Sequence, residues 1–230
     1  MATAEECHQL HGESSCTGTC PRLRPQDVNV YVGRSRISPK DQSPLKVTKI
    51  EVNEAWQNSL IREDGHDMAI LRLENELTFN ETIRPICLPK QDLMLNTGRN
   101  VNINGFGYTD GPNKISAEVL QRGSMQILDC NSLNVSFLDL GVRGDQVCAH
   151  SAGVDSCQGD SGGGLTTVVN VGREKSPIPV LVGLTSYGDS CSGNQPGVYT
   201  NVKTHMQWII QKIFGKHGKF ANSLGILQNI

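Results

Sequence analysis

Residues 155–163 read DSCQGDSGG, a glycine-rich stretch in which Ser161, near the end, is a candidate nucleophile. Glycines on both sides of Ser161 indicate a tight turn on which the serine hydroxyl can project. The backbone N–H groups of Gly159 and Ser161 can then point to one spot, which is the geometry that stabilises an oxyanion in acyl transfer. A bare Gly-x-Ser-x-Gly pattern more often marks a plain glycine turn, but nine specific residues in a row favour the catalytic interpretation.

Six further segments belong to the same sequence pattern, which covers nearly the whole chain. They are HDMAILRL at 66–73, RPICLP at 84–89, NGFG at 104–107, SYG at 186–188, PGVY at 196–199 and WI at 208–209. Together with residues 155–163, they resemble the trypsin-like (chymotrypsin-family) serine proteases, with Phe106 where that family has Trp. The resemblance implies two six-stranded antiparallel β-barrels with the active site in the cleft between them.

Composition and patterning independently favour an all-β fold. The chain has 230 residues, 24 of them Gly and 10 Pro, with 37% hydrophobic and 19% charged residues, which is typical of many short strands joined by turns. Apolar segments that indicate strands occur at 28–32, 47–52, 68–73, 101–103, 180–184 and 198–202. Residues 202–214 have the 3.6-residue spacing of a helix, which Gly215 should end.

The expected organisation is one peptidase domain over residues 1–215 and a flexible tail over 216–230. Within the domain, residues 1–89 would form a truncated first barrel and linker, so that the first barrel is incomplete. Residues 90–215 would form the second barrel and a C-terminal α-helix.

The charge balance excludes some partners. Lys and Arg total 21 against 23 Asp and Glu, a formal net charge of −2, which argues against a generally basic nucleic-acid binder and a polyacidic disordered chain. The longest purely aliphatic run, near residues 180–182, is far too short to span a membrane. We therefore expect neither a nucleic-acid nor a membrane partner.

The resemblance assigns roles to individual residues. Ser161 would be the nucleophile, Asp67 the carboxylate that orients the catalytic histidine, and the N–H groups of Gly159 and Ser161 the oxyanion hole. Asp155 would lie at the base of the specificity pocket, with Gly188 and Gly197 in its walls. A carboxylate there selects a protein or peptide substrate, or an inhibitor, with an Arg or Lys side chain. No cofactor and no metal site are expected.

One member of the catalytic set is missing. The family has Thr-Ala-Ala-His-Cys where this chain has TAEEC at residues 3–7, so Glu6 stands at the histidine position. A carboxylate, with an ordinary pKa of about 4.3, is a weak base for a serine hydroxyl. Each of the six histidines is interpreted as an ordinary surface or packing residue, because His66 should face away from Asp67 and His150 and His205 should lie in loops or the terminal helix. The chain as written is therefore expected to be inactive.

A second departure concerns activation. In the family, a new N-terminal ammonium pairs with the aspartate that precedes the nucleophile, here Asp160. This chain starts only a few residues before Glu6 and lacks that N-terminus, so we expect the site to remain zymogen-like.

The eight cysteines indicate a disulfide framework and an oxidising compartment. The resemblance implies the bridges Cys130–Cys148 and Cys157–Cys191, and it leaves the pairing of the other cysteines open: Cys7, Cys16, Cys20 and Cys87. An extracellular location is expected, although residues 1–12 have no signal-peptide pattern. One explanation is that the chain begins partway through a longer protein.

Two functional hypotheses follow. The intact Asp67, Asp155, Gly159 and Ser161 favour a trypsin-like endopeptidase whose sequence here is incomplete. Glu6 favours a non-catalytic protease homologue that binds or regulates through the same fold. The nine-residue match excludes an unrelated disulfide-rich binding domain.

Overall fold

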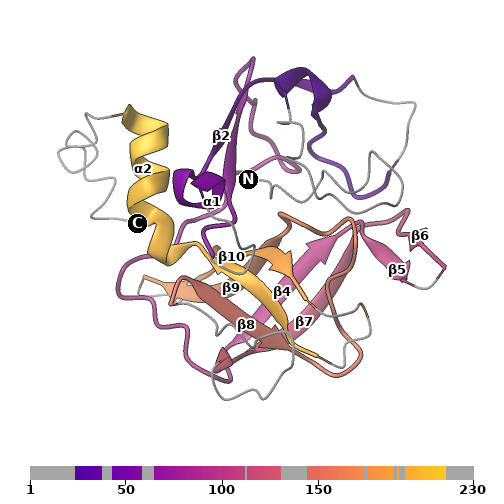
Figure 1. Ribbon diagram of the computed structural model, residues 1–230, viewed down its shortest axis with the longest axis vertical. Helices are drawn as coiled ribbons and strands as arrows, with labels where there is room; N and C mark the ends of the chain where they lie inside the picture. The colour runs from indigo at the N-terminus through magenta and orange to yellow at the C-terminus, as the bar shows by residue number, and fades with distance from the viewer. Residues whose placement is uncertain are drawn as a thin grey trace.

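The computed structural model describes residues 24–37, 43–58, 65–111, 113–130, 144–172, 176–188, 191 and 195–215. The expectations for Glu6, Cys7, Cys16, Cys20 and the tail over 216–230 lie outside these residues. The described chain forms a small N-terminal sheet, a closed barrel and a C-terminal helix (Figure 1). The structure thus confirms the all-β class with a terminal helix.

The N-terminal part is an antiparallel three-stranded sheet in the order β1-β2-β3. Its elements are η2 (Pro25–Asp27), β1 (Asn29–Val30), β2 (Leu45–Val52), α1 (Glu54–Asn58) and β3 (Ala69–Leu73). Among the described residues this part has three paired strands, fewer than the six of a complete barrel.

The second part is a closed antiparallel barrel of six strands in the order β10-β11-β8-β7-β4-β9. The strands are β4 (Asn100–Gly105), β7 (Gln121–Leu128), β8 (Gln146–His150), β9 (Gly164–Val171), β10 (Ser176–Tyr187) and β11 (Gly197–Asn201). A separate hairpin pairs β5 (Tyr108–Asp110) with β6 (Ile115–Ser116). Alternate residues such as Val101 and Ile103 point into the barrel, where they pack against Met125 and Ile127.

From Val180 to Ser186, strand β10 is buried on both faces and connects the barrel to the rest of the molecule. Val180 and Val182 lie in the barrel interior, whereas Leu181 and Leu184 belong to a second cluster with Met68 and the C-terminal helix. The pairing of β10 shifts register twice, between Leu181 and Gly183 and between Thr185 and Tyr187. Both shifts are β-bulges or similar irregularities, which change the direction in which local side chains point.

The C-terminal helix α2 (Met206–Phe214) follows a 3-10 turn, η6 (Lys203–His205). Met206 and Ile209 are buried against Met68 and β10. The expected stop is confirmed, because Gly215 takes a positive φ of 72° and donates its N–H to the Gln211 carbonyl. None of the described helices is long and apolar enough to cross a membrane.

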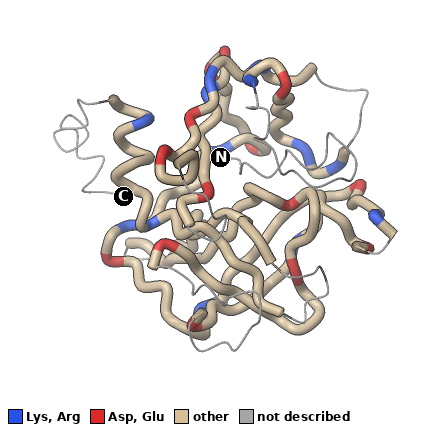
Figure 2. The backbone as a smooth tube through the Cα atoms, in the orientation of Figure 1, with Lys and Arg blue, Asp and Glu red and all other residues tan. Residues whose placement is uncertain are grey.

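The structure contains both disulfides that the resemblance implies, Cys130–Cys148 and Cys157–Cys191. In the described part of the chain, Cys87 is a free, exposed cysteine. Its carbonyl accepts the N–H of Leu181 at 2.9 Å, so the linker before the barrel is fastened to β10. Acidic and basic residues occur in both the N-terminal part and the barrel (Figure 2).

Candidate active site

Ser161 lies on a sharp turn that glycines make possible. Gly159 and Gly162 have positive φ angles of 92° and 76°, a region that side chains disfavour. The N–H of Asp160 donates to the Cys157 carbonyl at 2.9 Å, and the N–H of Gly163 donates to the Asp160 carbonyl at 2.8 Å. The turn that carries Ser161 is therefore built by its own backbone, and it includes both N–H groups assigned to an oxyanion hole.

The Asp160 carboxylate fixes this turn to the loop after β4. One oxygen accepts the N–H of Gly107 at 2.8 Å, and the other accepts the N–H of Cys157 at 3.0 Å. A Cβ atom on Gly105 or Gly107 would lie 1.8 or 2.5 Å from the nearest carboxylate atom of Asp160. The glycines of the NGFG segment are thus required by the close approach of this side chain.

Asp67 is buried between the two parts of the molecule and is only 2% exposed. Its Oδ2 accepts a hydrogen bond from Ser186 Oγ at 2.7 Å. Its backbone carbonyl accepts one from Thr200 Oγ1 at 2.8 Å. The aspartate is thus held by hydroxyl groups from β10 and β11.

One dipeptide of β10 connects Asp67 to the Ser161 turn. Thr185 donates its N–H to the Gly163 carbonyl at 2.9 Å, and Gly162 donates its N–H to the Thr185 carbonyl at 3.0 Å. The next residue, Ser186, holds Asp67 and falls within the second register shift of the strand. The candidate nucleophile and carboxylate therefore attach to adjacent residues of one strand.

The bond from Ser186 to Asp67 was not expected from the sequence. The available signal was a serine that ends a long apolar run, where a buried hydroxyl needs a partner. Its direction depends on the register shift, which the sequence pattern does not reveal.

The residues assigned to the specificity pocket also lie together. Asp155 is half-buried, and its negative charge contributes, after burial itself, to raising the pKa of the Tyr199 hydroxyl. A Cβ on Gly197 would lie 2.9 Å from that hydroxyl, and a Cβ on Gly188 would lie 3.9 Å from the Gly197 Cα. A side chain at Gly197 would therefore meet the Tyr199 ring, and one at Gly188 would point toward the Gly197 backbone.

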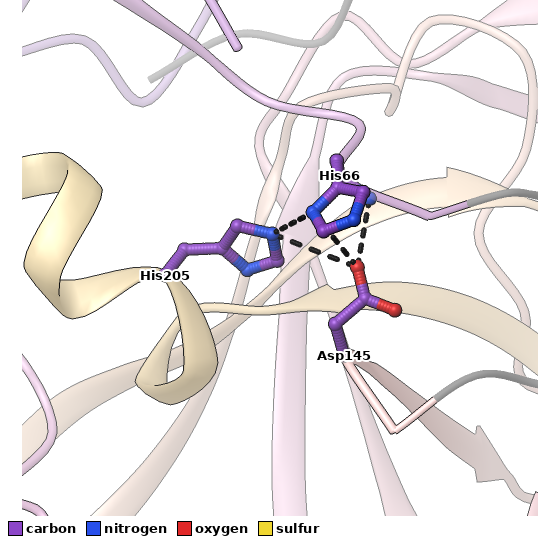
Figure 3. A group of neighbouring side chains, drawn as sticks. All are labelled: His66, Asp145 and His205. Carbon is purple, nitrogen blue, oxygen red and sulfur yellow. Dashed lines mark hydrogen bonds and ion pairs between the residues drawn. The ribbon is translucent and has the colours of Figure 1, made fainter. Parts of the chain in front are cut away.

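A cluster of His66, Asp145 and His205 lies at the junction of the two parts (Figure 3). His66 Nδ1 is 3.0 Å from His205 Nε2 and 3.3 Å from Asp145 Oδ2, and the last two atoms are 3.6 Å apart. Burial lowers the pKa of His205. The contact among these three side chains was not expected from the sequence, and the expectation for His150 is wrong, because it lies in β8 instead of a loop or the terminal helix. The three members are far apart in sequence, so no spacing motif identifies them.

Comparisons with known proteins agree with this geometry. A family model described as Trypsin matches residues 14–209. Coagulation factor XI from Bos taurus is 31% identical over 202 residues, which are 83% of this chain and 30% of that protein. Suppressor of tumorigenicity 14 protein homolog from Bos taurus is 34% identical over 151 residues, 64% of this chain and 17% of that protein. The chain thus spans less than a third of either relative.

A solved structure shows the same fold. It is neuropsin, described as a serine protease expressed in the limbic system of mouse brain, with a TM-score of 0.66 and 26% identity. The match covers 79% of this chain and 77% of the neuropsin chain. Since the family model spans most of the sequence and the structural match spans most of both chains, this chain belongs to the trypsin family of serine proteases.

Proposed function

We propose that this domain recognises protein or peptide segments through an Arg or Lys side chain, and that Ser161 is its nucleophile. The observation that carries the proposal is the shared β10 attachment of Asp67 and the Ser161 turn. Asp155, near Tyr199 and flanked by wall glycines without side chains, provides a negative charge for a guanidinium or ammonium group.

The chemistry follows from these positions. A substrate side chain that pairs with Asp155 places its carbonyl carbon near Ser161, whose hydroxyl attacks it. The N–H groups of Gly159 and Ser161 stabilise the resulting oxyanion. A base must accept the serine proton, and Asp67 orients that base when it is histidine.

Glu6 limits this reaction in the chain as written. A carboxylate accepts the serine proton poorly near neutral pH, and loss of the base lowers turnover by about 10⁴- to 10⁶-fold in comparable enzymes. We therefore propose that this sequence binds Arg- or Lys-containing segments but cleaves them very slowly.

Binding of benzamidine, a small cationic amidine, tests the pocket. The Asp155→Asn variant should bind it roughly 10- to 100-fold more weakly than the native chain, because it removes a charge-assisted hydrogen bond. Isothermal titration calorimetry gives both Kd values, and Asp92→Asn, at an exposed site, is the matched control. Equal affinities of native and Asp155→Asn chains would contradict the pocket assignment.

Restoring the histidine tests the base. Glu6→His should label at Ser161 with a fluorophosphonate, and hydrolyse an arginyl ester, at least about 100-fold faster than the native chain. Glu5→His is the matched control at the neighbouring position and should show no gain. Fast labelling of the native chain, or equal rates for the two variants, would show that Glu6 does not stand at the base position.

A further inference from the structure

The His66–Asp145–His205 cluster brings together three ligand atoms from distant segments. His66 precedes β3, Asp145 precedes β8 and His205 lies in η6 before α2. Ligands bound about 2.0–2.2 Å from a tetrahedral Zn²⁺ lie roughly 3.3–3.6 Å from one another. The three separations here are 3.0, 3.3 and 3.6 Å, so two lie within that range and the separation of the two histidine nitrogens is slightly shorter before any adjustment to an ion.

The rings also present the correct nitrogens. His205 Nδ1 lies 2.8 Å from the Asn201 carbonyl oxygen, an acceptor, so the ring donates from Nδ1 and turns the Nε2 lone pair toward the cluster. A ligating histidine typically donates its other N–H to such a carbonyl. For His66, the tautomer that carries its proton on Nε2 leaves the Nδ1 lone pair free to bind an ion. The two rings are nearly perpendicular, at 81°, so they converge without stacking.

The backbone holds Asp145 in place before any ion binds. Its Oδ2 accepts the N–H of His66 at 2.9 Å, and its carbonyl accepts the N–H of Asn201 at 2.8 Å. A Cβ on Gly65 would lie 2.5 Å from the same Oδ2, so only glycine permits this approach. His66 itself has a positive φ of 61°, an uncommon conformation that turns its ring toward the cluster.

We propose that His66 Nδ1, His205 Nε2 and Asp145 Oδ2 bind one Zn²⁺ ion, with water as the fourth ligand. Two imidazoles and one carboxylate suit Zn²⁺, whereas Ca²⁺ and Mg²⁺ prefer oxygen ligands. The His66 side chain is 41% exposed, which gives the ion a route from solvent, while Asp145 and His205 are 13% and 5% exposed. The ion would link the segment that contains Asp67 to the barrel and to η6.

Zinc titration of the full chain tests the site. At a free Zn²⁺ concentration about 100 times Kd, the Tm should rise by roughly 5–10 °C, because an ion that binds only the folded state stabilises it. His66→Asn should raise the Kd for Zn²⁺ at least about 100-fold, since one ligand is lost. Asparagine tolerates a positive φ, so this variant retains the backbone conformation and should fold.

Controls separate this site from other zinc ligands in the chain. His150→Gln, outside the cluster, should bind Zn²⁺ with the native Kd. Co²⁺ bound in place of Zn²⁺ should give the visible absorption of a four-coordinate ion without the thiolate bands that Cys87 would add. Equal Zn²⁺ affinity of the native and His66→Asn chains, or a thiolate spectrum, would overturn the proposal.

Discussion

Ser186 is the residue on which the candidate active site depends most directly. Its hydroxyl donates to the buried carboxylate of Asp67 at 2.7 Å. A hydrogen bond to a charged group contributes about 1.5–3 kcal/mol, and a buried acceptor that loses its donor costs a similar amount. The bond therefore serves both the fold and the orientation of the carboxylate.

Ser186→Ala should lower the free energy of unfolding by about 1–3 kcal/mol, because the Asp67 carboxylate loses this donor. Urea denaturation followed by circular dichroism measures the change. Ser124→Ala is the matched control, since Ser124 bonds Asn102 on an exposed face and its loss should cost about 0.5 kcal/mol or less. Equal destabilisation by the two variants would contradict the role of Ser186.

At the scale of elements, a polar contact fastens helix α2 to α1. Glu54 of α1 accepts a hydrogen bond from Trp208 Nε1 at 2.8 Å and forms an ion pair with Lys212. The bonds from Lys212 and then Trp208 lower the pKa of Glu54 to about 2. Glu51 lies on the other side of Lys212, at 3.9 Å, and also pairs with Lys49 and Arg72.

The sign of the pH dependence follows from this lowered pKa. Glu54 stabilises the fold fully above its ordinary pKa of 4.5, and the contribution is lost as the pH falls toward 2. The side chain is 56% exposed, so solvent limits the contribution to at most about 1 kcal/mol.

Glu54→Gln should therefore be less stable than the native chain at pH 7 and equally stable near pH 2. Thermal unfolding measured from pH 7 to pH 2 gives the difference in Tm at each pH. Glu118→Gln, on a side chain that is 85% exposed, is the control and should differ little from the native chain at any pH. A constant difference between Glu54→Gln and the native chain across this range would rule out the ion pair as its cause.

The sequence predicted some elements and missed others for physical reasons. The strands with strong apolar patterns, β2, β3, β4, β10 and β11, were expected close to their observed positions, as was the stop of α2 at Gly215. Strand β7 was missed because only Met125 and Ile127 of its eight residues are fully buried, between polar neighbours. Strand β8 was missed because its first four residues are all buried, so its side chains do not alternate between core and solvent, and the first of them, Gln146, is polar.

At the scale of the whole molecule, local motifs and long-range contacts differ in what sequence can reveal. The turn around Ser161 is local, so its glycines indicate it directly. The Asp67–Ser186 bond and the His66–Asp145 contact join residues 119 and 79 positions apart, and their geometry depends on how the barrel packs against the N-terminal sheet. No pattern of residue spacing in the sequence predicts how the barrel packs against this sheet.

The register shift between Thr185 and Tyr187 makes the number of residues in β10 as important as their identity. Deleting one residue after Leu184 would bring Tyr187 to the place of Ser186 and turn the aromatic ring toward Asp67. Any redesign of this protein must therefore keep this strand at its present length.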